Sequence, residues 1–546
     1  MNKTIMAGCA WALSLILLVT ACSGNPEGDK EAVPKDGNAP ITLSVFSGQR
    51  ADVENLETNT FSKYVENKLN IKFKWEVVPN AGLNDKKQLL LASGDYPELF
   101  LDGNLTQAEQ LKYGQQGVFI PLNDLIDQYA PNVKKAFKDI PYLQKGITAP
   151  DGKIYSIPQI NECYHCWYAQ KMWINTKWLE KLGLSMPTTT EEYYQVLKAF
   201  KEKDPNGNGK ADEIPLSGAG DPATWHGNID GFLMSAFIYN NSADYFTMKD
   251  GKVDFAPNKP EWKKGLEYMN RLYKEGLIDQ ASFTQNQDGL KQLGNNPDTA
   301  ILGSFTAGHI GMVVDTAPGK TRHKDYDAVP PLKGPDGVQL SGYFAGVGNG
   351  TFAITNKASK EKAIAAMKLA DYMYTEEAAL LSIFGPEGKW WSKAKPEEKD
   401  VRGRPAKYIT APEFDSIQQQ NEHWSQMGSS LRTRDYRESF AVPQDPLGNG
   451  GYEYRLYLAT QKYEKYQPKE MYPISIFMDP QDADAANQLR TTINAYVKTS
   501  MVEFIIGRKN LNNDWDAYVK GLDGLNLPQY MKIYQKAYDS VYKKSS

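Results

Sequence analysis

The 546-residue chain is poor in cysteine, in histidine and in runs of like charge. It has four cysteines and five histidines, and its formal net charge is only −4 at pH 7. It has no long basic run, so it lacks the electrostatic footprint of a protein whose main partner is nucleic acid. It also has no HExxH motif and no second CxxC, which leaves no spaced ligand set for a zinc site.

Long apolar runs are also scarce, and the clearest one lies at the N-terminus. Lys3 precedes an apolar run from Ala10 to Val19, which is too short for a good membrane-spanning helix but typical of a secretory signal. The run closes on VTAC, so Cys22 directly follows a small-residue cleavage site, as in a bacterial lipobox. We predict a lipoprotein signal peptide in residues 1–21 and lipidation of Cys22. An ordinary cleaved signal with an incidental cysteine is the alternative.

Two acyl chains on Cys22 would supply stable anchoring, which one chain cannot. We therefore expect a lipid-anchored protein on the extracytoplasmic face of the cell membrane. Residues 22–40 have few apolar side chains and form the predicted flexible tether. Cys163 and Cys166, in ECYHCW, are then the only cysteines left in the body. Outside the cytoplasm we expect a local disulfide or two inert thiols, with a redox pair or a metal site as alternatives.

The length of the chain predicts two or more lobes, because single cores stop growing near ~250–300 residues. Residues 41–48 and 71–78 alternate apolar and other side chains, as half-buried strands do, and apolar positions within 61–69 have helical spacing. A strand, a helix and a strand over this length predict a βαβ unit and a parallel sheet. Short strands are expected at 97–101 and 153–158.

A helix that begins with a capping box, Thr189 and Glu192, leads directly into the loop KEKDPNGNGKADEIPL. The loop places oxygen-bearing residues at positions 1, 3, 5 and 9 of an EF-hand-type calcium loop, with a glycine at 6 and a backbone carbonyl at 7. Position 12 is Pro215, which has no carboxylate, so Glu213 is the expected replacement. The predicted calcium ligands are Asp204, Asn206, Asn208, Lys210, Asp212 and Glu213. We expect a structural Ca²⁺; an empty turn and a regulatory or catalytic ion are the alternatives.

Several segments resemble one protein family. These are MWINTKWLEKLGLSMPTTTEEYYQVLKAF with the loop that follows it, LEYMNRLYKEGLIDQASFTQ, FAITNKASKEKAIAAMKLADYMYTEE, FGPEGKWW and the C-terminal YVKTSMVEFIIGRKNLNNDWDAYVKGL. They are similar to the extracellular solute-binding proteins of ABC importers, family 1, and within them to the group of the alginate-binding proteins, which hold one calcium in such a loop. Lys177 departs from the acidic residue usual before this tryptophan. The resemblance spans about residues 40–542.

The resemblance implies an α/β, two-lobe periplasmic-binding-protein-like fold with an interlobe ligand cleft and helical C-terminal additions. The expected N-lobe comprises 41–168 plus 338–378, and the expected C-lobe 169–337 plus 379–546 with the calcium loop 204–213. The implied function is capture of an oligosaccharide and its delivery to the permease of an ABC importer, by a monomer without catalytic residues. A peptide-binding lipoprotein and an extracellular carbohydrate-active enzyme are the alternatives.

Sugar recognition needs flat apolar faces and polar groups for the hydroxyls. The aromatic side chains expected near the cleft are Trp167, Trp225, Tyr343, Trp390, Trp391 and Trp424. The polar side chains expected to bind the ligand are Arg50, Asp102, Asn161, Glu162, His226 and Arg432. Of these, the arginines could pair with uronate carboxylates.

Overall fold

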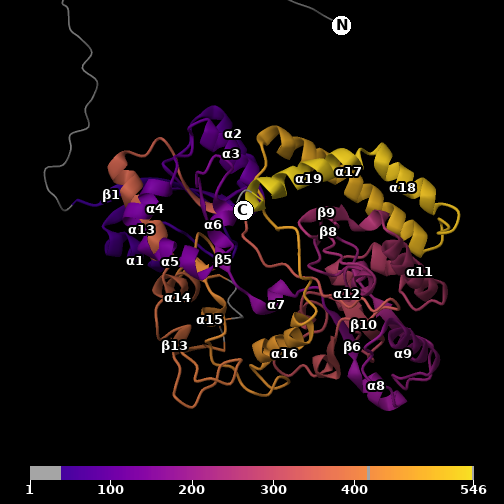
Figure 1. Ribbon diagram of the computed structural model, residues 1–546. Coiled ribbons are helices and arrows are strands. Elements are labelled where there is room, and N and C mark those ends of the chain that lie inside the picture. Colours follow the sequence, from indigo (N-terminus) through magenta and orange to yellow (C-terminus); the bar gives the residue numbers. More distant parts are fainter. Residues whose placement is uncertain (1–38, 413, 415–418, 544–546) are drawn as a thin grey trace, which may run out of the picture. The chain divides into compact units, whose positions relative to one another are not determined.

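The computed structural model describes residues 39–412, 414 and 419–543 (Figure 1). The predicted signal peptide, Cys22 and nearly all of the tether lie outside the described residues. Within the described part of the chain, no helix combines the length and apolar character needed to cross a membrane. Residues from Ile41 onward form one compact unit that contains two large sheets.

The first sheet has five strands in the order β2-β1-β3-β12-β4. They are β2 (Ile71–Pro79), β1 (Ile41–Gln49), β3 (Leu99–Leu105), β12 (Gly350–Ile354) and β4 (Ile157–Pro158). β1 pairs in parallel with β2 and with β3, as the βαβ reading predicts, whereas β12 runs antiparallel to β3 and β4. Alternation places Leu43 and Val45 in the core with no exposed surface.

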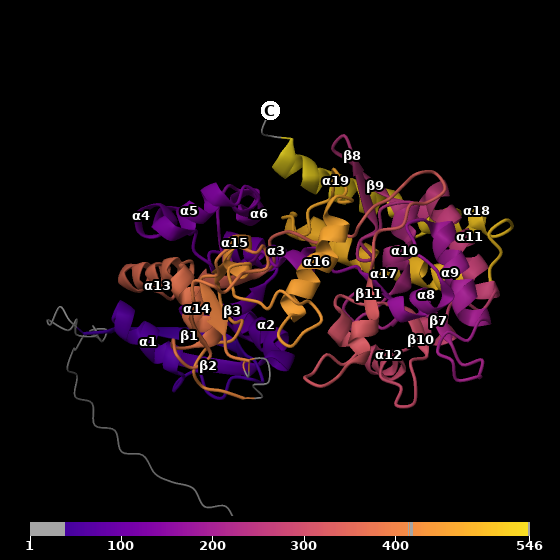
Figure 2. The same ribbon diagram turned by 90° about the horizontal axis from the view of Figure 1, so that it is seen from below.

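Eight helices lie in the segments that flank this sheet. They are α1 (Thr60–Leu69), α2 (Leu83–Ser93), α3 (Gln107–Gln115), α4 (Asn123–Tyr129), α5 (Pro131–Asp139), α6 (Leu143–Ile147), α13 (Lys360–Met373) and α14 (Glu376–Phe384). Figure 2 shows α13 between α4 and α5 on one side and the strands on the other, in agreement with its contacts to β1, α4 and α5. Its alanines and Met367 belong to the core of this sheet. Small side chains on this helix allow it to approach the sheet closely.

The second sheet has four strands in the order β11-β6-β10-β7. They are β11 (Tyr326–Val329), β6 (Met172–Asn175), β10 (Leu302–Thr306) and β7 (Ile214–Ser217). The helices associated with its core are α8 (Thr176–Leu182), α9 (Thr190–Glu202), α10 (Ile229–Leu233), α11 (Pro260–Lys274), α12 (Gln287–Gly294) and α16 (Tyr452–Glu464). Thr189 and Glu192 form the predicted capping box of α9. A hairpin of β8 (Phe246–Lys249) and β9 (Lys252–Phe255) completes this part.

Three C-terminal helices pack against the second core, as predicted. They are α17 (Pro480–Ile505), α18 (Trp515–Gly524) and α19 (Leu527–Tyr542), which follow one another in yellow in Figure 1. α17 contacts both α11 and α19, and Ile493 and Phe504 share a buried cluster with Trp262 of α11. An apolar stripe on a long helix thus finds its partner in an element more than 200 residues earlier.

The structure corrects one predicted boundary, the passage to the second lobe at residue 379. After α14, the chain stays with the first core: Gln420 bridges to Val53, and Trp424 packs against Phe61. The short strand β15 (Leu431–Arg432) pairs in parallel with β5 (Ile160–Asn161). The second core is joined only at α16, through Leu456 and Tyr463. Helical periodicity near residue 380 marked an element, but it carries no information on the sheet that the next segment covers.

Candidate functional site

A polar group forms where β3, β5 and β15 come together. Asp102 in β3 has a left-handed backbone (φ 62°), which is strained for a residue with a Cβ, and its carboxylate accepts from Gly428 N at 3.2 Å. Burial raises the pKa of Asp102, while the Gly428 N–H and the nearby Arg50 lower it. The half-exposed Arg50 pairs with Asp52 at 2.9 Å. The polar group therefore contains both a partly buried acid and an accessible cation.

Gln159, between β4 and β5, is hydrogen-bonded to several members of this group. Its amide nitrogen donates to the carbonyl oxygens of Gln426 (2.8 Å) and Gly428 (3.1 Å), and its amide oxygen accepts from Arg432 Nη2 at 3.0 Å. Next along the strand, Asn161 Oδ1 is buried without a hydrogen-bond partner. An unsatisfied buried acceptor is costly, and such groups mark places where another molecule completes the hydrogen bonding.

Glu162 follows and is already engaged within the protein. Its carboxylate accepts from Tyr142 Oη at 3.1 Å and from the backbone N–H of Arg434 at 2.9 Å. These contacts leave Glu162 half-buried and fix its orientation beside the polar group.

An aromatic group surrounds Trp225, whose residue surface is 38% exposed. The Trp225 ring lies 5.2 Å from His226 and 6.0 Å from His309, and His226 lies 4.4 Å from Phe344, all between centroids. A Cβ on Gly308 would lie 2.2 Å from the indole, so only glycine lets the ring rest on this backbone. The indole thus rests against this backbone and remains partly exposed to solvent, and an accessible aromatic ring is what a sugar platform requires.

Burial lowers the pKa of His226 to about 4, and the nearby Lys171 contributes to this shift. His226 Nδ1 lies 3.0 Å from Gln170 Oε1, which fixes the orientation of the ring. His226 is therefore neutral at physiological pH. It can offer a ring face and a hydrogen bond, but no charge.

The segment between the two sheets contributes further rings. α7 (Tyr164–Trp167) joins β5 to β6, and the half-buried Trp167 lies 6.1 Å from Tyr343 between centroids. The Trp167 carbonyl accepts from Phe344 N at 2.8 Å. Two chain segments that are distant in sequence are thus fixed to each other beside the aromatic group.

Three predicted platforms lie elsewhere. Trp424 is 1% exposed within the first core, and Trp391 is 7% exposed and donates from Nε1 to Gly385 O, so neither offers a face to a ligand. Trp390 donates from Nε1 to Glu422, next to strands β13 (Trp391–Lys393) and β14 (Tyr408–Thr410). Among the described residues, no ring contact or hydrogen bond joins Trp390 to the other candidates.

The sequence-based selection omitted several residues of these groups: Gln159, His309, Phe344, Gln426, Arg437 and Tyr452. The closest contact among them joins Tyr452 Oη to His309 Nδ1 at 2.6 Å. No local motif marks any of them. Their only distinguishing signal is their position in loops or at element ends close to residues that were selected.

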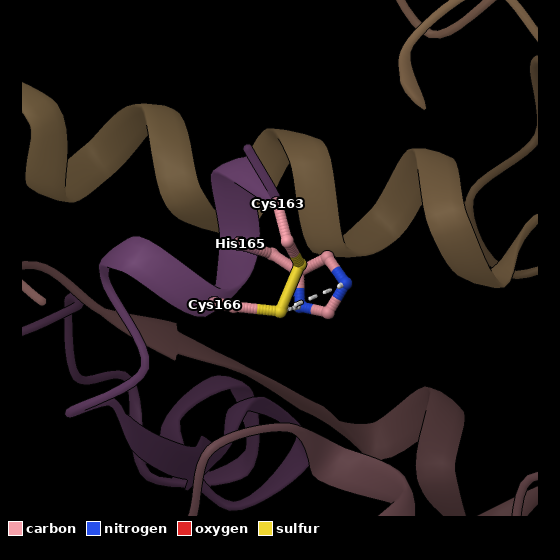
Figure 3. A group of neighbouring side chains, drawn as sticks. All are labelled: Cys163, His165 and Cys166. Atoms are coloured by element: carbon pink, nitrogen blue, oxygen red, sulfur yellow. Dashed lines mark hydrogen bonds between the residues drawn. A yellow bond between two sulfur atoms is a disulfide. The ribbon is translucent and has the colours of Figure 1, made fainter. Parts of the chain in front are cut away.

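Cys163 and Cys166 form a disulfide across α7, which agrees with the expectation of a local disulfide. Figure 3 shows the His165 ring beside the sulfur atoms, and among the described residues these three are the one group of His, Cys, Asp or Glu ligand atoms that all lie within 4.8 Å of one another. Burial, then Lys171 and Arg437, hold the pKa of His165 well below its usual range. Disulfide-bonded sulfurs are not thiolate ligands, so the pair braces the connection between the sheets.

Lys171, directly before β6, is fully buried. Its Nζ donates to the carbonyl oxygens of His165, at 3.0 Å, and Tyr168. No carboxylate of the described residues lies within ion-pair distance of it. Burial lowers the pKa of Lys171 to about 7.

This shift predicts a pH-dependent stability. The unfolded chain keeps the lysine proton up to about pH 10.4, whereas the folded chain loses it near pH 7, so stability rises with pH between those values. We expect the free energy of unfolding of wild type, relative to Lys171→Met, to increase by about 2 kcal/mol from pH 7.5 to 9.5. Urea titrations of both proteins at each pH would measure this. A constant difference would show that the ammonium is retained in the fold.

The loop between α9 and β7 collects the predicted calcium ligands. Asp204 accepts from the backbone N–H groups of Gly207 (2.8 Å), Asn208 (3.1 Å) and Gly209 (3.0 Å), so the chain winds around its carboxylate. Asp212 accepts from the side-chain amides of Asn206 and Asn208 at 2.8 and 2.9 Å. The loop is therefore wound around two carboxylates in the manner of an ion-binding turn.

Glu213 provides the test of whether these residues fit a cation. Its Oε1 is buried and has no hydrogen-bond partner. Burial raises the pKa of Glu213, and Asp204 and Asp212 add to the rise. A buried carboxylate oxygen without a donor, close to two further acids, fits the oxygen-rich environment of Ca²⁺.

Comparison with known proteins gives the family. Residues 54–380 match the family model described as bacterial extracellular solute-binding protein. The chain belongs to this family. The fructooligosaccharide ABC transporter substrate-binding protein FusA of Streptococcus pneumoniae serotype 4 is 30% identical over 472 residues, covering 83% of this chain and 82% of FusA.

Solved structures agree with this assignment. FusA in complex with kestose has a TM-score of 0.71 at 26% identity, covering 92% of this chain and 100% of that one. An extracellular solute-binding protein from Bifidobacterium longum subsp. infantis has a TM-score of 0.77 at 25% identity, over 93% and 99% of the two chains. An EF-hand mutant of FusA in complex with fructo-nystose is also similar, with a TM-score of 0.68 at 25% identity, over 92% and 100%.

These matches confirm the two-lobe solute-binding fold with its C-terminal helices. In the solute-binding protein, each lobe is built on one of the two large sheets, and α7 is one connection between them. Membership of a family of binding proteins also confirms the prediction of a binder in place of an enzyme.

Proposed function

We propose that this solute-binding protein captures an oligosaccharide between its two lobes and delivers it to the permease of an ABC importer. The observation that carries the proposal is the aromatic group, in which the exposed face of Trp225 lies beside His226, His309 and Phe344. The polar group of Asp102, Gln159 and Asn161 would serve the hydroxyls. FusA, which is similar over most of this chain, binds a fructooligosaccharide, which supports a saccharide ligand.

The mechanism that we propose is a population shift. A saccharide that contacts both lobes binds the closed form more tightly than the open form, and therefore raises the population of the closed form. The closed form then docks on the permease. Small-angle scattering with and without ligand tests this part. An unchanged radius of gyration at saturation would contradict closure.

Two further proposals concern how the protein is anchored and how its fold is stabilised. We propose that Cys22 carries the lipid that anchors the monomeric protein outside the membrane, with residues 22–40 as tether. We also propose that Asp204, Asn206, Asn208, Lys210 O, Asp212 and Glu213 hold a structural Ca²⁺. The chemistry of the loop and the EF-hand of the similar FusA support the ion. When bound, it would compensate the clustered carboxylates and tie α9 to β7.

The first experiment is a thermal-shift screen of residues 41–546 against plant and bacterial oligosaccharides. A ligand at a hundredfold excess over Kd stabilises by ~2.7 kcal/mol, which a melting curve resolves. The ligand should be recovered intact by mass spectrometry. Recovery of fragments would contradict a binding protein, and a response to peptides alone would favour peptide capture.

Replacing Trp225 by alanine is expected to weaken saccharide binding about fivefold to thirtyfold, because stacking and apolar contact of an indole contribute roughly 1–2 kcal/mol. Isothermal titration calorimetry measures the loss. Trp390→Ala is the matched control, since it removes an indole without contacts to the aromatic group. Equal losses in both variants would show that Trp225 is not a platform.

A further inference from the structure

Two arginines near α7 have no acidic partner. Arg432 ends β15, Arg437 ends the single-turn helix α15 (Arg434–Arg437), and no carboxylate of the described residues lies within 4.0 Å of either guanidinium. Arg434, between them, is paired with Glu438 at 2.8 Å and Glu464 at 3.3 Å. Among the described residues, Arg434 therefore has two acidic partners, whereas Arg432 and Arg437 have none within ion-pair distance.

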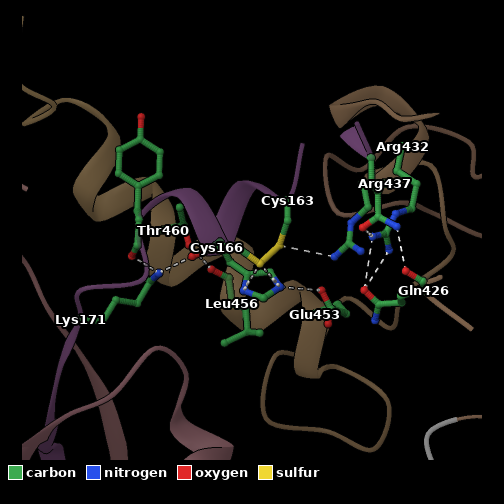
Figure 4. The surroundings of a disulfide bond; sticks show 12 residues. Cys163, Cys166, Lys171, Gln426, Arg432, Arg437, Glu453, Leu456 and Thr460 are labelled. Atoms are coloured by element: carbon green, nitrogen blue, oxygen red, sulfur yellow. Dashed lines mark hydrogen bonds and ion pairs between the residues drawn. A yellow bond between two sulfur atoms is a disulfide. The ribbon is translucent and has the colours of Figure 1, made fainter. Parts of the chain in front are cut away.

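The guanidinium of Arg432 contacts neutral amide oxygens and no carboxylate of the described residues. Both of its Nη atoms donate to a single oxygen, Gln426 Oε1, at 3.3 Å each, and Nε has no partner (Figure 4). The arginine is 2% exposed, whereas Gln426 is exposed. Nη2 also donates to Gln159 Oε1 at 3.0 Å, which is again a neutral amide oxygen. Two neutral amide oxygens thus stand where a carboxylate would offer two charged ones.

A second cation, Arg437, lies on the α7 side of Arg432. Its Nη2 is 3.5 Å from Cys163 Sγ. A buried guanidinium without a counter-charge is unfavourable, and burial, with Arg437 nearby, lowers the pKa of Arg432 to about 9.

The acids near this cluster are already engaged. Glu162 accepts from Tyr142 and from Arg434 N, and Asp102 accepts from Gly428 N. Glu453 lies 3.8 Å from His165 Nε2. Within the part of the chain that the structure describes, no acid thus pairs with Arg432 or Arg437.

We propose that Arg432, assisted by Arg437, binds a carboxylate of the ligand, which takes the place of the Gln426 amide oxygen. The ligand is then an acidic saccharide that contains a uronate residue. The free Asn161 Oδ1, on the strand paired with β15, can accept from a hydroxyl of the same sugar unit. This inference rests on the proposed function and narrows it to a substrate class.

The test uses paired oligosaccharides, each as the free acid and as the methyl ester of its carboxyl groups: oligogalacturonate, oligoglucuronate and oligomannuronate. Calorimetry on the wild-type protein should show at least one acid that binds tenfold to hundredfold more tightly than its ester, as expected for hydrogen bonds to a charged group. Raising the salt concentration should lower the affinity for the acid and leave the affinity for the ester unchanged.

Single-residue variants show which side chains cause the preference for the acid over the ester. Arg432→Gln should abolish the preference for the acid while the ester keeps its affinity, and Arg437→Gln should reduce the preference severalfold. Gln426→Ala removes only the competing oxygen, so the preference should persist or grow. Because Arg432→Gln could disturb folding, Arg432→Lys, which keeps the charge but not the fork, should fold and show an intermediate preference.

Two outcomes would overturn the assignment. One is equal binding of acid and ester to wild type, and the other is an equal loss of both ligands in Arg432→Gln and Arg432→Lys, which would show a purely structural arginine. Binding of neutral saccharides with no acid preference would leave the proposed function intact. If no saccharide binds, acidic or neutral, the proposed function fails together with this inference.

Discussion

Replacing Trp424 by alanine is expected to lower the free energy of unfolding by about 3–5 kcal/mol, the usual cost of removing a fully buried aromatic side chain. The indole is 1% exposed and packs edge-on against Phe61 (4.8 Å) and Trp75 (6.0 Å) between centroids. Its Nε1 donates to Ser62 Oγ at 2.8 Å, so the truncation also leaves a buried hydroxyl without this donor. Urea unfolding followed by far-ultraviolet circular dichroism measures the change.

Trp225→Ala is the control for this prediction. Because Trp225 is 38% exposed, its loss should change the free energy of unfolding by less than about 1 kcal/mol. The two variants should then behave in opposite ways: Trp424→Ala loses stability but binds ligand normally when folded, and Trp225→Ala keeps stability but loses affinity. A stable Trp424→Ala protein with impaired binding would return Trp424 to the list of ligand platforms.

The second large effect is expected from calcium. A loop of this kind has a Kd of ~10⁻⁴–10⁻³ M, so 10 mM Ca²⁺ should stabilise the protein by about 1.4–2.7 kcal/mol relative to EDTA. Glu213→Gln should remove most of this gain. In EDTA, however, the variant should be at least as stable as wild type, because a buried carboxylate without a donor is replaced by a neutral amide.

Thermal melts of both proteins in CaCl₂ and in EDTA would show whether the curves cross in this way. Glu261→Gln, which alters an exposed acid in α11, is the matched control and should respond to calcium as wild type does. Mg²⁺ at the same concentration should give a smaller shift, since it requires tighter octahedral geometry. A wild-type melting curve that is identical in CaCl₂ and EDTA would contradict the structural ion.

Several features could be predicted from the sequence because their causes are local. The alternation in residues 41–48 and 71–78 corresponds to β1 and β2, and the capping box of Thr189 and Glu192 begins α9. The loop proposed to bind calcium could be selected from the sequence because all its candidate donors lie within ten residues. In each case the determining contacts join residues that are close along the chain.

The candidate site could be predicted only in part. Trp225, His226 and Trp167 lie in or beside the aromatic group, whereas Trp424 and Trp391 lie in cores. Nothing in the neighbourhood of a tryptophan in a loop states whether the ring faces solvent. For Trp424 this was decided by Ser62, which lies 362 residues earlier in the chain.

The sequence by itself determined the family, the two-lobe class, the helices and strands with strong periodicity, and the residues able to hold a cation. Only the tertiary structure decided that the described segments between α14 and α16 remain with the first core, that the indole of Trp225 is exposed, and that no acid of the described residues pairs with Arg432 or Arg437. The reason is physical. Periodicity and caps reflect interactions over a few residues, while burial and charge compensation depend on segments that folding brings together from hundreds of residues apart.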